Sequence, residues 1–215
     1  MIIPEKKLFY IKIPKTGSTS VAQVIWQAYG IGRNDRSDRV INLNWPAEGP
    51  LDHRGWHMSL DRILDHLGAD ADRYRGFTVI REPVERMMSV YRWAKSKATA
   101  RGNPCLDDFA AFLTAVFEDD ARLPPQARLH SLPQCDWLRG GGAWSGELSI
   151  FTLDRLQECG RYLSQVLGPY PEFPHVNVSE KFDVTVPSDM HARLKDHYAE
   201  DFALYHRTKT RPLGR

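Results

Sequence analysis

The chain has 215 residues, of which 42% are hydrophobic and 26% charged, and its formal net charge is +2. These proportions are typical of a soluble globular protein, and the length predicts one domain with a sizeable core over residues 1–215. The net charge is small and the Lys and Arg residues are scattered, which argues against nucleic acid as a partner.

The cysteines and the first residues bear on location. Cys105, Cys135 and Cys159 lack the spacing of a metal site and suggest no disulfide framework, which favours a reducing compartment. Residues 1–7 are too few and too charged for a signal peptide, and the chain has no run of about 18 apolar residues. We therefore expect a cytoplasmic protein without a transmembrane segment.

The first predicted elements are a strand over residues 8–13 and a helix over 18–29, joined by a tight turn. A strand, a turn with a lysine and hydroxyl residues at a helix start are typical of a phosphate-binding loop. The first N–H groups of the helix point outwards, and the helix dipole favours an anion there. The loop lacks the G-x-x-x-x-G-K-[ST] sequence of nucleotide hydrolases. Its candidate binding residues are Lys15, Thr16, Gly17, Ser18, Thr19 and Ser20.

A second candidate segment follows a polar, turn-rich loop over residues 30–55 and a predicted helix over 59–67. Residues 77–80 read as a short buried strand that ends at Arg81. Pro83 then suits the first turn of a helix, which the apolar spacing extends to about residue 98. Arg81 therefore stands at the carboxyl end of a strand, where open α/β sheets bind ligands.

The rest of the chain continues the alternation of strands and helices. The patterns predict helices over 107–117, 154–167 and 188–205, a strand over 148–152, and mixed structure over 123–146. This order predicts an α/β fold with a P-loop-type parallel β-sheet flanked by helices.

The segments IPKTGSTS, starting at Ile13, and VIREPVERMMSVY, starting at Val79, resemble the two cofactor signatures of one enzyme family. These are the sulfotransferases that use 3′-phosphoadenosine 5′-phosphosulfate (PAPS). The first resembles the 5′-phosphosulfate loop P-K-T-[GA]-[GS]-T-[ST], and the second the 3′-phosphate motif R-x-P-x-x-R-x-x-S-x-Y. The chain is most similar to the carbohydrate branch, which includes the uronyl 2-O-sulfotransferases and many bacterial members.

The resemblance implies sulfuryl transfer from PAPS to a hydroxyl of a carbohydrate acceptor, without a metal. Lys15 would neutralise the leaving phosphate oxygen, and residues 16–20 would bind the 5′-phosphosulfate. Arg81 and Ser89 would hold the 3′-phosphate. Arg86 stays open between a functional role and an ion pair with Glu82.

A general base must also take the proton of the acceptor hydroxyl. Residues 55–60 resemble the short histidine motif between the cofactor loops of the 2-O-sulfotransferases, so His57 is the candidate and His53 its competitor. His53, Gln134 and Asn177 are candidate substrate contacts, although Asn and Gln are also common loop anchors. A sugar could stack on some of the tryptophans, but core packing is the commoner use of the residue. The tryptophans considered are Trp45, Trp56, Trp93, Trp137 and Trp144.

Two other functions stay open. A P-loop kinase would bind nucleotide at the same loop, but the chain has no Walker loop and no clear strand that ends in a metal-binding Asp. A catalytically inactive nucleotide-binding module would keep Lys15 and Arg81, yet it would need no base such as His57. The sequence indicates neither the acceptor nor the oligomeric state.

Overall fold

The computed structural model describes residues 1–33, 35, 37–42, 57–97, 101–140, 142, 144–169, 173 and 185–210. They belong to two compact units. Unit 1 comprises residues 1–80 and 134–177, and unit 2 comprises 81–133 and 178–215. Each unit is described by itself, and the single domain expected over 1–215 stays a prediction.

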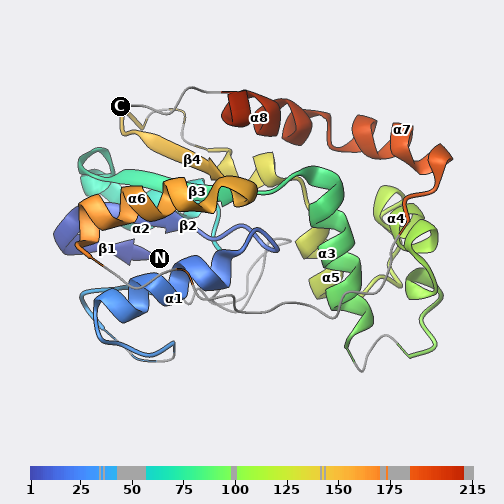
Figure 1. The fold of residues 1–215 in the computed structure, drawn as a ribbon, viewed down its shortest axis with the longest axis horizontal. Coiled ribbons are helices and arrows are strands. Elements are labelled where there is room, and N and C mark those ends of the chain that lie inside the picture. The colour runs from blue at the N-terminus through green and yellow to red at the C-terminus, as the bar shows by residue number, and fades with distance from the viewer. Residues whose placement is uncertain are drawn as a thin grey trace. The chain divides into compact units, whose positions relative to one another are not determined.

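Unit 1 is built on a sheet whose strands are ordered β1-β2-β3-β4 (Figure 1). The strands are β1 (Ile2–Ile3), β2 (Leu8–Ile11), β3 (Arg75–Ile80) and β4 (Leu148–Thr152). β1 is antiparallel to β2, while β2, β3 and β4 are parallel, with Ile11 paired to Thr78 and Thr78 to Ile150. The α/β prediction is confirmed. Parallel pairing brings the carboxyl ends of β2, β3 and β4 to one edge of the sheet.

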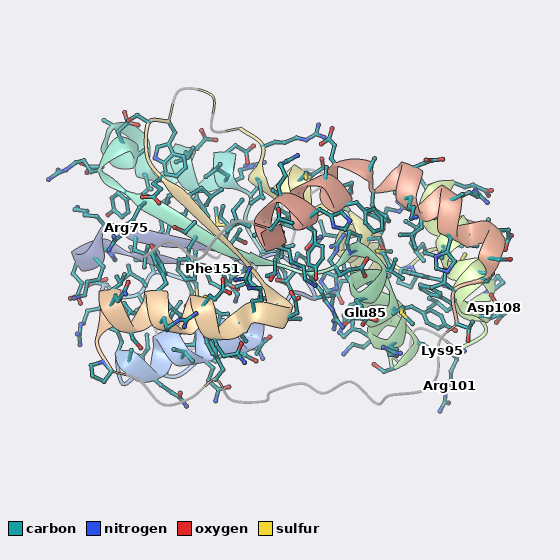
Figure 2. The ribbon with its side chains drawn as sticks, turned by 45° about the horizontal axis from the view of Figure 1, so that its top comes forward. Arg75, Glu85, Lys95, Arg101, Asp108 and Phe151 are labelled. Carbon is teal, nitrogen blue, oxygen red and sulfur yellow. The ribbon has the colours of Figure 1, made fainter. Side chains whose placement is uncertain are left out.

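Helices α1 (Ser18–Ala28) and α6 (Leu156–Leu167) pack on the same core of unit 1 (Figure 1). The Tyr10 and Phe77 rings stack there with centroids 4.6 Å apart. Phe151, labelled in Figure 2, packs on Tyr162 of α6 with a centroid distance of 5.4 Å. Apolar burial by these aromatic and aliphatic side chains is the main force that holds the helices on the sheet. The shorter helices of unit 1 are η1 (Pro4–Lys6), α2 (Leu60–Leu67), η2 (Gly68–Arg73), η5 (Gln134–Leu138) and η6 (Leu153–Arg155).

Unit 2 is helical over its described residues (Figure 1). Its helices are α3 (Pro83–Lys95), η4 (Pro104–Leu106), α4 (Phe109–Phe117), α5 (Pro125–Ser131), α7 (Ser188–His197) and α8 (Ala199–Thr210). The single helix predicted over 188–205 is wrong, because Tyr198 interrupts it with φ −109° and ψ 29°. The buried Tyr198 hydroxyl donates to the Ser131 carbonyl at 2.6 Å, a tertiary contact that helical spacing does not reveal.

Arg86 of α3 is fully buried, and it donates to the carboxyl end of α5. Its guanidinium bonds the carbonyl oxygens of His130 at 3.0 Å, Ser131 at 3.4 Å and Leu132 at 2.5 Å. The last carbonyls of a helix have no partner inside that helix and carry its negative dipole end. Arg86 therefore acts as a side-chain cap for α5, a structural role that differs from the ion pair with Glu82 considered from the sequence.

We predict that Arg86→Leu lowers the free energy of unfolding by roughly 3 kcal/mol or more, because it leaves buried carbonyls without a donor. The free energy of unfolding of Arg86→Lys should lie between those of the parent and of Arg86→Leu, since an ammonium lacks the planar guanidinium fork that reaches three carbonyls. Arg73→Ala, which removes an ion pair with Asp70 between side chains 67% and 58% exposed, is the control and should change little. Denaturant unfolding measures all three, and parental stability in Arg86→Leu would contradict the capping role.

Candidate functional site

The predicted phosphate-binding loop follows β2 directly and has an unusual backbone. Lys15 and Gly17 both have left-handed conformations, with φ of 64° and 78°. At Gly17 a Cβ would also lie 2.6 Å from Cδ1 of Leu153, the residue that follows β4. The turn therefore requires glycine at this position, and it holds Lys15 in a conformation that non-glycine residues adopt only under constraint.

The start of α1 has the properties of an anion-binding site. Gly17 is its N-cap and offers no side chain to the first N–H groups, and the first turn contains no acidic residue. The Thr16 hydroxyl is buried and donates to the Ile13 carbonyl at 3.0 Å, which closes the loop from inside. A 5′-phosphosulfate group fits this set of helix N–H donors, serine hydroxyls and a lysine. Ser18 and Ser20 are buried, whereas Lys15, Gly17 and Thr19 are partly exposed.

Lys12, one residue beyond β2, is a site feature that the sequence analysis missed. Only 7% of the residue is exposed, and its ammonium lies 5.6 Å from the centre of the Trp26 ring. Burial, with a smaller contribution from the positive charge of Arg33, lowers the pKa of Lys12 to about 8. Buried lysines with a displaced pKa gather at functional sites, so burial next to a loop of this kind is the signal that only the fold provides.

His57 contacts the same strand end. Its Nδ1 lies 2.5 Å from the carbonyl oxygen of Lys12. A carbonyl oxygen can only accept, so we assign the proton to Nδ1, which leaves Nε2 as the nitrogen that can take up a proton. The predicted base is thereby bonded to the backbone three positions before Lys15 in the chain.

The segment that packs against His57 is η5, which also contacts α2, the helix that begins at Leu60. Trp137 of η5 approaches the His57 ring edge-on, with centroids 6.0 Å apart and planes at 64°. Gln134, at the start of η5, is fully buried in unit 1. Unit 1 thus contains the predicted phosphate-binding loop, His57 and Gln134.

Unit 2 contains the other candidate phosphate ligands, Arg81 and Ser89. Arg81 follows the last residue of β3, and its guanidinium pairs with the Glu85 carboxylate at 3.2 Å. Glu85 lies on the first turn of α3 (Figure 2). Burial lowers the pKa of Arg81, and the Glu85 carboxylate counteracts that effect. Ser89 lies one turn beyond Glu85 and is 9% exposed. Glu82 is the N-cap of α3 and accepts the Glu85 backbone N–H at 2.8 Å, a bond that orders the turn next to Arg81.

Some predictions lie beyond these contacts. His53 and Asn177 are outside the described residues. Within the described residues, no group of three or more His, Cys, Asp or Glu side chains is placed to hold a metal ion. None of the helices described above combines the length and the hydropathy that crossing a bilayer requires.

We predict that Lys12→Met stabilises the protein at pH 7. The lysine of the unfolded chain keeps its proton to about pH 10.4, whereas buried Lys12 loses it near pH 8. Between these values the unfolded state binds more protons, so the free energy of unfolding rises with pH. Below about pH 8 both states are protonated, and the folded state carries the whole cost, on the order of 3 kcal/mol.

Denaturant unfolding of the parent and of Lys12→Met from pH 6 to 10 measures this cost. The advantage of the variant should be constant below about pH 8 and should shrink above it. Lys6→Met, at an exposed position of η1, is the control, and its free energy of unfolding should change with pH as that of the parent does. A Lys12→Met variant that is less stable than the parent at pH 7 would show that the ammonium is well compensated.

One comparison with known proteins assigns the chain to a family. A family model described as the sulfotransferase family matches residues 1–138, which include the loop after β2, His57 and the Arg81 motif. No curated protein and no solved structure gives a significant match. Because the matched segment covers more than half of the 215 residues, the chain belongs to the sulfotransferase family.

Proposed function

We propose that this sulfotransferase transfers a sulfuryl group from PAPS to a hydroxyl group of a carbohydrate. One observation carries the proposal: His57 is hydrogen-bonded to Lys12, at the end of the strand that leads into the phosphate-binding loop. A base and an anion-binding helix start are thus anchored to one strand, as a hydroxyl-to-anion transfer requires. An inactive nucleotide-binding module has no need of this histidine, and against a kinase stand the missing Walker loop and the lack of a clear strand that ends in a metal-binding Asp.

The proposed roles follow from the chemistry of each group. PAPS, when bound, supplies the sulfuryl group and a phosphate oxygen as the leaving atom. Lys15 and the N–H groups at the start of α1 would together stabilise the negative charge that grows on that oxygen. Arg81 and Ser89 would bind the 3′-phosphate, for which a guanidinium fork is well suited. His57 would accept the proton of the attacking hydroxyl at Nε2.

The carbohydrate acceptor and the cytoplasmic location are separate parts of the proposal. The acceptor class rests on the similarity of residues 55–60 to the histidine motif of the uronyl 2-O-sulfotransferases. The location is supported by Cys105, Cys135 and Cys159, which are free thiols, as a reducing compartment favours. Labelled PAPS offered with uronic-acid polysaccharides, neutral sugars and phenols tests the acceptor class, and ATP with Mg²⁺ tests the kinase alternative.

For the nucleotide, we predict that adenosine 3′,5′-bisphosphate binds at least about tenfold more tightly than 5′-AMP, because Arg81 adds charge-assisted bonds to the 3′-phosphate. Arg81→Ala should remove most of this preference, whereas Lys15→Ala should lower the affinity for both nucleotides by the same factor. Glu85→Gln, which removes one carboxylate that pairs with the guanidinium, should increase the preference. Calorimetry measures each affinity, and equal binding of the two nucleotides to the parent would contradict the proposed 3′-phosphate site.

For the base, we predict that His57→Ala loses roughly 100-fold or more in turnover while it keeps the parental nucleotide affinity. The rate of the parent should rise with pH through one ionisation near neutrality, as the base loses its proton, and the variant should lack that ionisation. His66→Ala, at an exposed position of α2, is the matched control. Near-parental turnover in His57→Ala would remove His57 from the mechanism and would make His53 the next candidate.

A further inference from the structure

Trp137 has no role in the site described so far, although it lies against the predicted base. Only 1% of the residue is exposed, so its ring cannot stack on a sugar. Its indole N–H is buried without a hydrogen-bond partner. The indole N–H gains no hydrogen bond at this position, so what the residue contributes here is an aromatic ring and not a polar group.

The segment that carries Trp137 is held firmly against the helix that follows His57. η5 contacts α2, and just beyond it Gly140, with φ 103°, approaches Asp61 so closely that a Cβ on Gly140 would collide with the Asp61 Cβ. Asp61 lies four positions after His57 in the chain. The indole is therefore fixed relative to the backbone that carries the imidazole.

The hydrogen bond to Lys12 does not by itself fix the orientation of His57. A single bond from Nδ1 sets the direction of one ring atom and leaves the imidazole able to turn about it. The edge-on contact with Trp137, at 6.0 Å between centroids and 64° between planes, supplies a second restraint. With both restraints, Nδ1 keeps its proton for the Lys12 carbonyl and Nε2 keeps one direction.

We infer that Trp137 is a positioning residue for His57, an inference that rests on the proposed function. The O–H bond of the acceptor breaks as its proton passes to Nε2, and the acceptor oxygen forms a bond to sulfur. The bond from sulfur to the 5′-phosphate oxygen breaks, and its electron pair stays on that oxygen. Trp137 touches none of these atoms; it holds the imidazole that receives the proton.

The test compares Trp137→Leu and Trp137→Phe with the parent in two measurements. In ¹⁵N NMR of the histidine ring nitrogens, with His57 assigned by its absence in His57→Ala, the parent and Trp137→Phe should show the tautomer protonated at Nδ1. Trp137→Leu should show a mixture of tautomers. In kinetics, Trp137→Leu should lose about tenfold or more in kcat, with unchanged affinity for adenosine 3′,5′-bisphosphate and a displaced pH–rate midpoint. Trp137→Phe should stay within about threefold of the parent.

Trp144→Leu separates positioning from a general loss of stability. Trp144 packs on Phe9 in the same unit, with centroids 5.4 Å apart, and its loss should leave the tautomer and the pH–rate midpoint unchanged. If Trp137→Leu fails to fold, Trp137→Met fills more of the space without a ring edge and carries the same expectation. Parental tautomer and kcat in a folded variant would overturn the inference. A parent without sulfuryl transfer would instead refute the proposed function, and the NMR comparison would still decide whether Trp137 orients His57.

Discussion

Parallel hydrogen bonding between β2, β3 and β4 determines where the candidate site of unit 1 begins. Ile11, Thr78 and Ile150 stand in register across the three strands, so the strands end at the same edge. The loop with Lys15 leaves this edge from β2, and Leu153 follows β4 to meet Gly17. Since the pairing comes from backbone groups, it holds the loop without demanding particular side chains from the strands.

Around that edge the chain accepts several locally unfavourable states. Lys15 adopts a left-handed conformation, Lys12 is buried with a lowered pKa, and the Trp137 indole has no acceptor. The missing hydrogen bond is not confined to Trp137, because the buried Tyr10 hydroxyl of the same unit also has no partner, whereas apolar side chains such as Phe77 and Val79 are buried without conflict. Such departures gather at functional sites, because binding and catalysis need groups that are held in place and incompletely satisfied.

Two arginines of one sequence motif have different surroundings. Arg81 follows a strand, is partly exposed and pairs with a mostly exposed carboxylate of Glu85, which a competing anion could displace. Arg86 is fully buried, and its guanidinium donates hydrogen bonds to the carbonyl oxygens at the end of α5. The spacing of the two residues makes them look equivalent, but α5 comes from a segment some 40 positions later, within the predicted mixed region.

The sequence alone determined the features that depend on near neighbours in the chain. These include the α/β class, the helix from Ser18, the proline that opens α3 and the two segments that resemble cofactor motifs, because capping, turns and periodicity act over a few residues. Only the tertiary structure decided what His57 and Trp137 contact, that Lys12 is buried and that Arg86 caps α5. It also decided that the last predicted helix breaks at Tyr198. Each of these results rests on contacts between residues far apart in the chain, between Lys12 and His57 or between Tyr198 and Ser131, and no local pattern encodes such contacts.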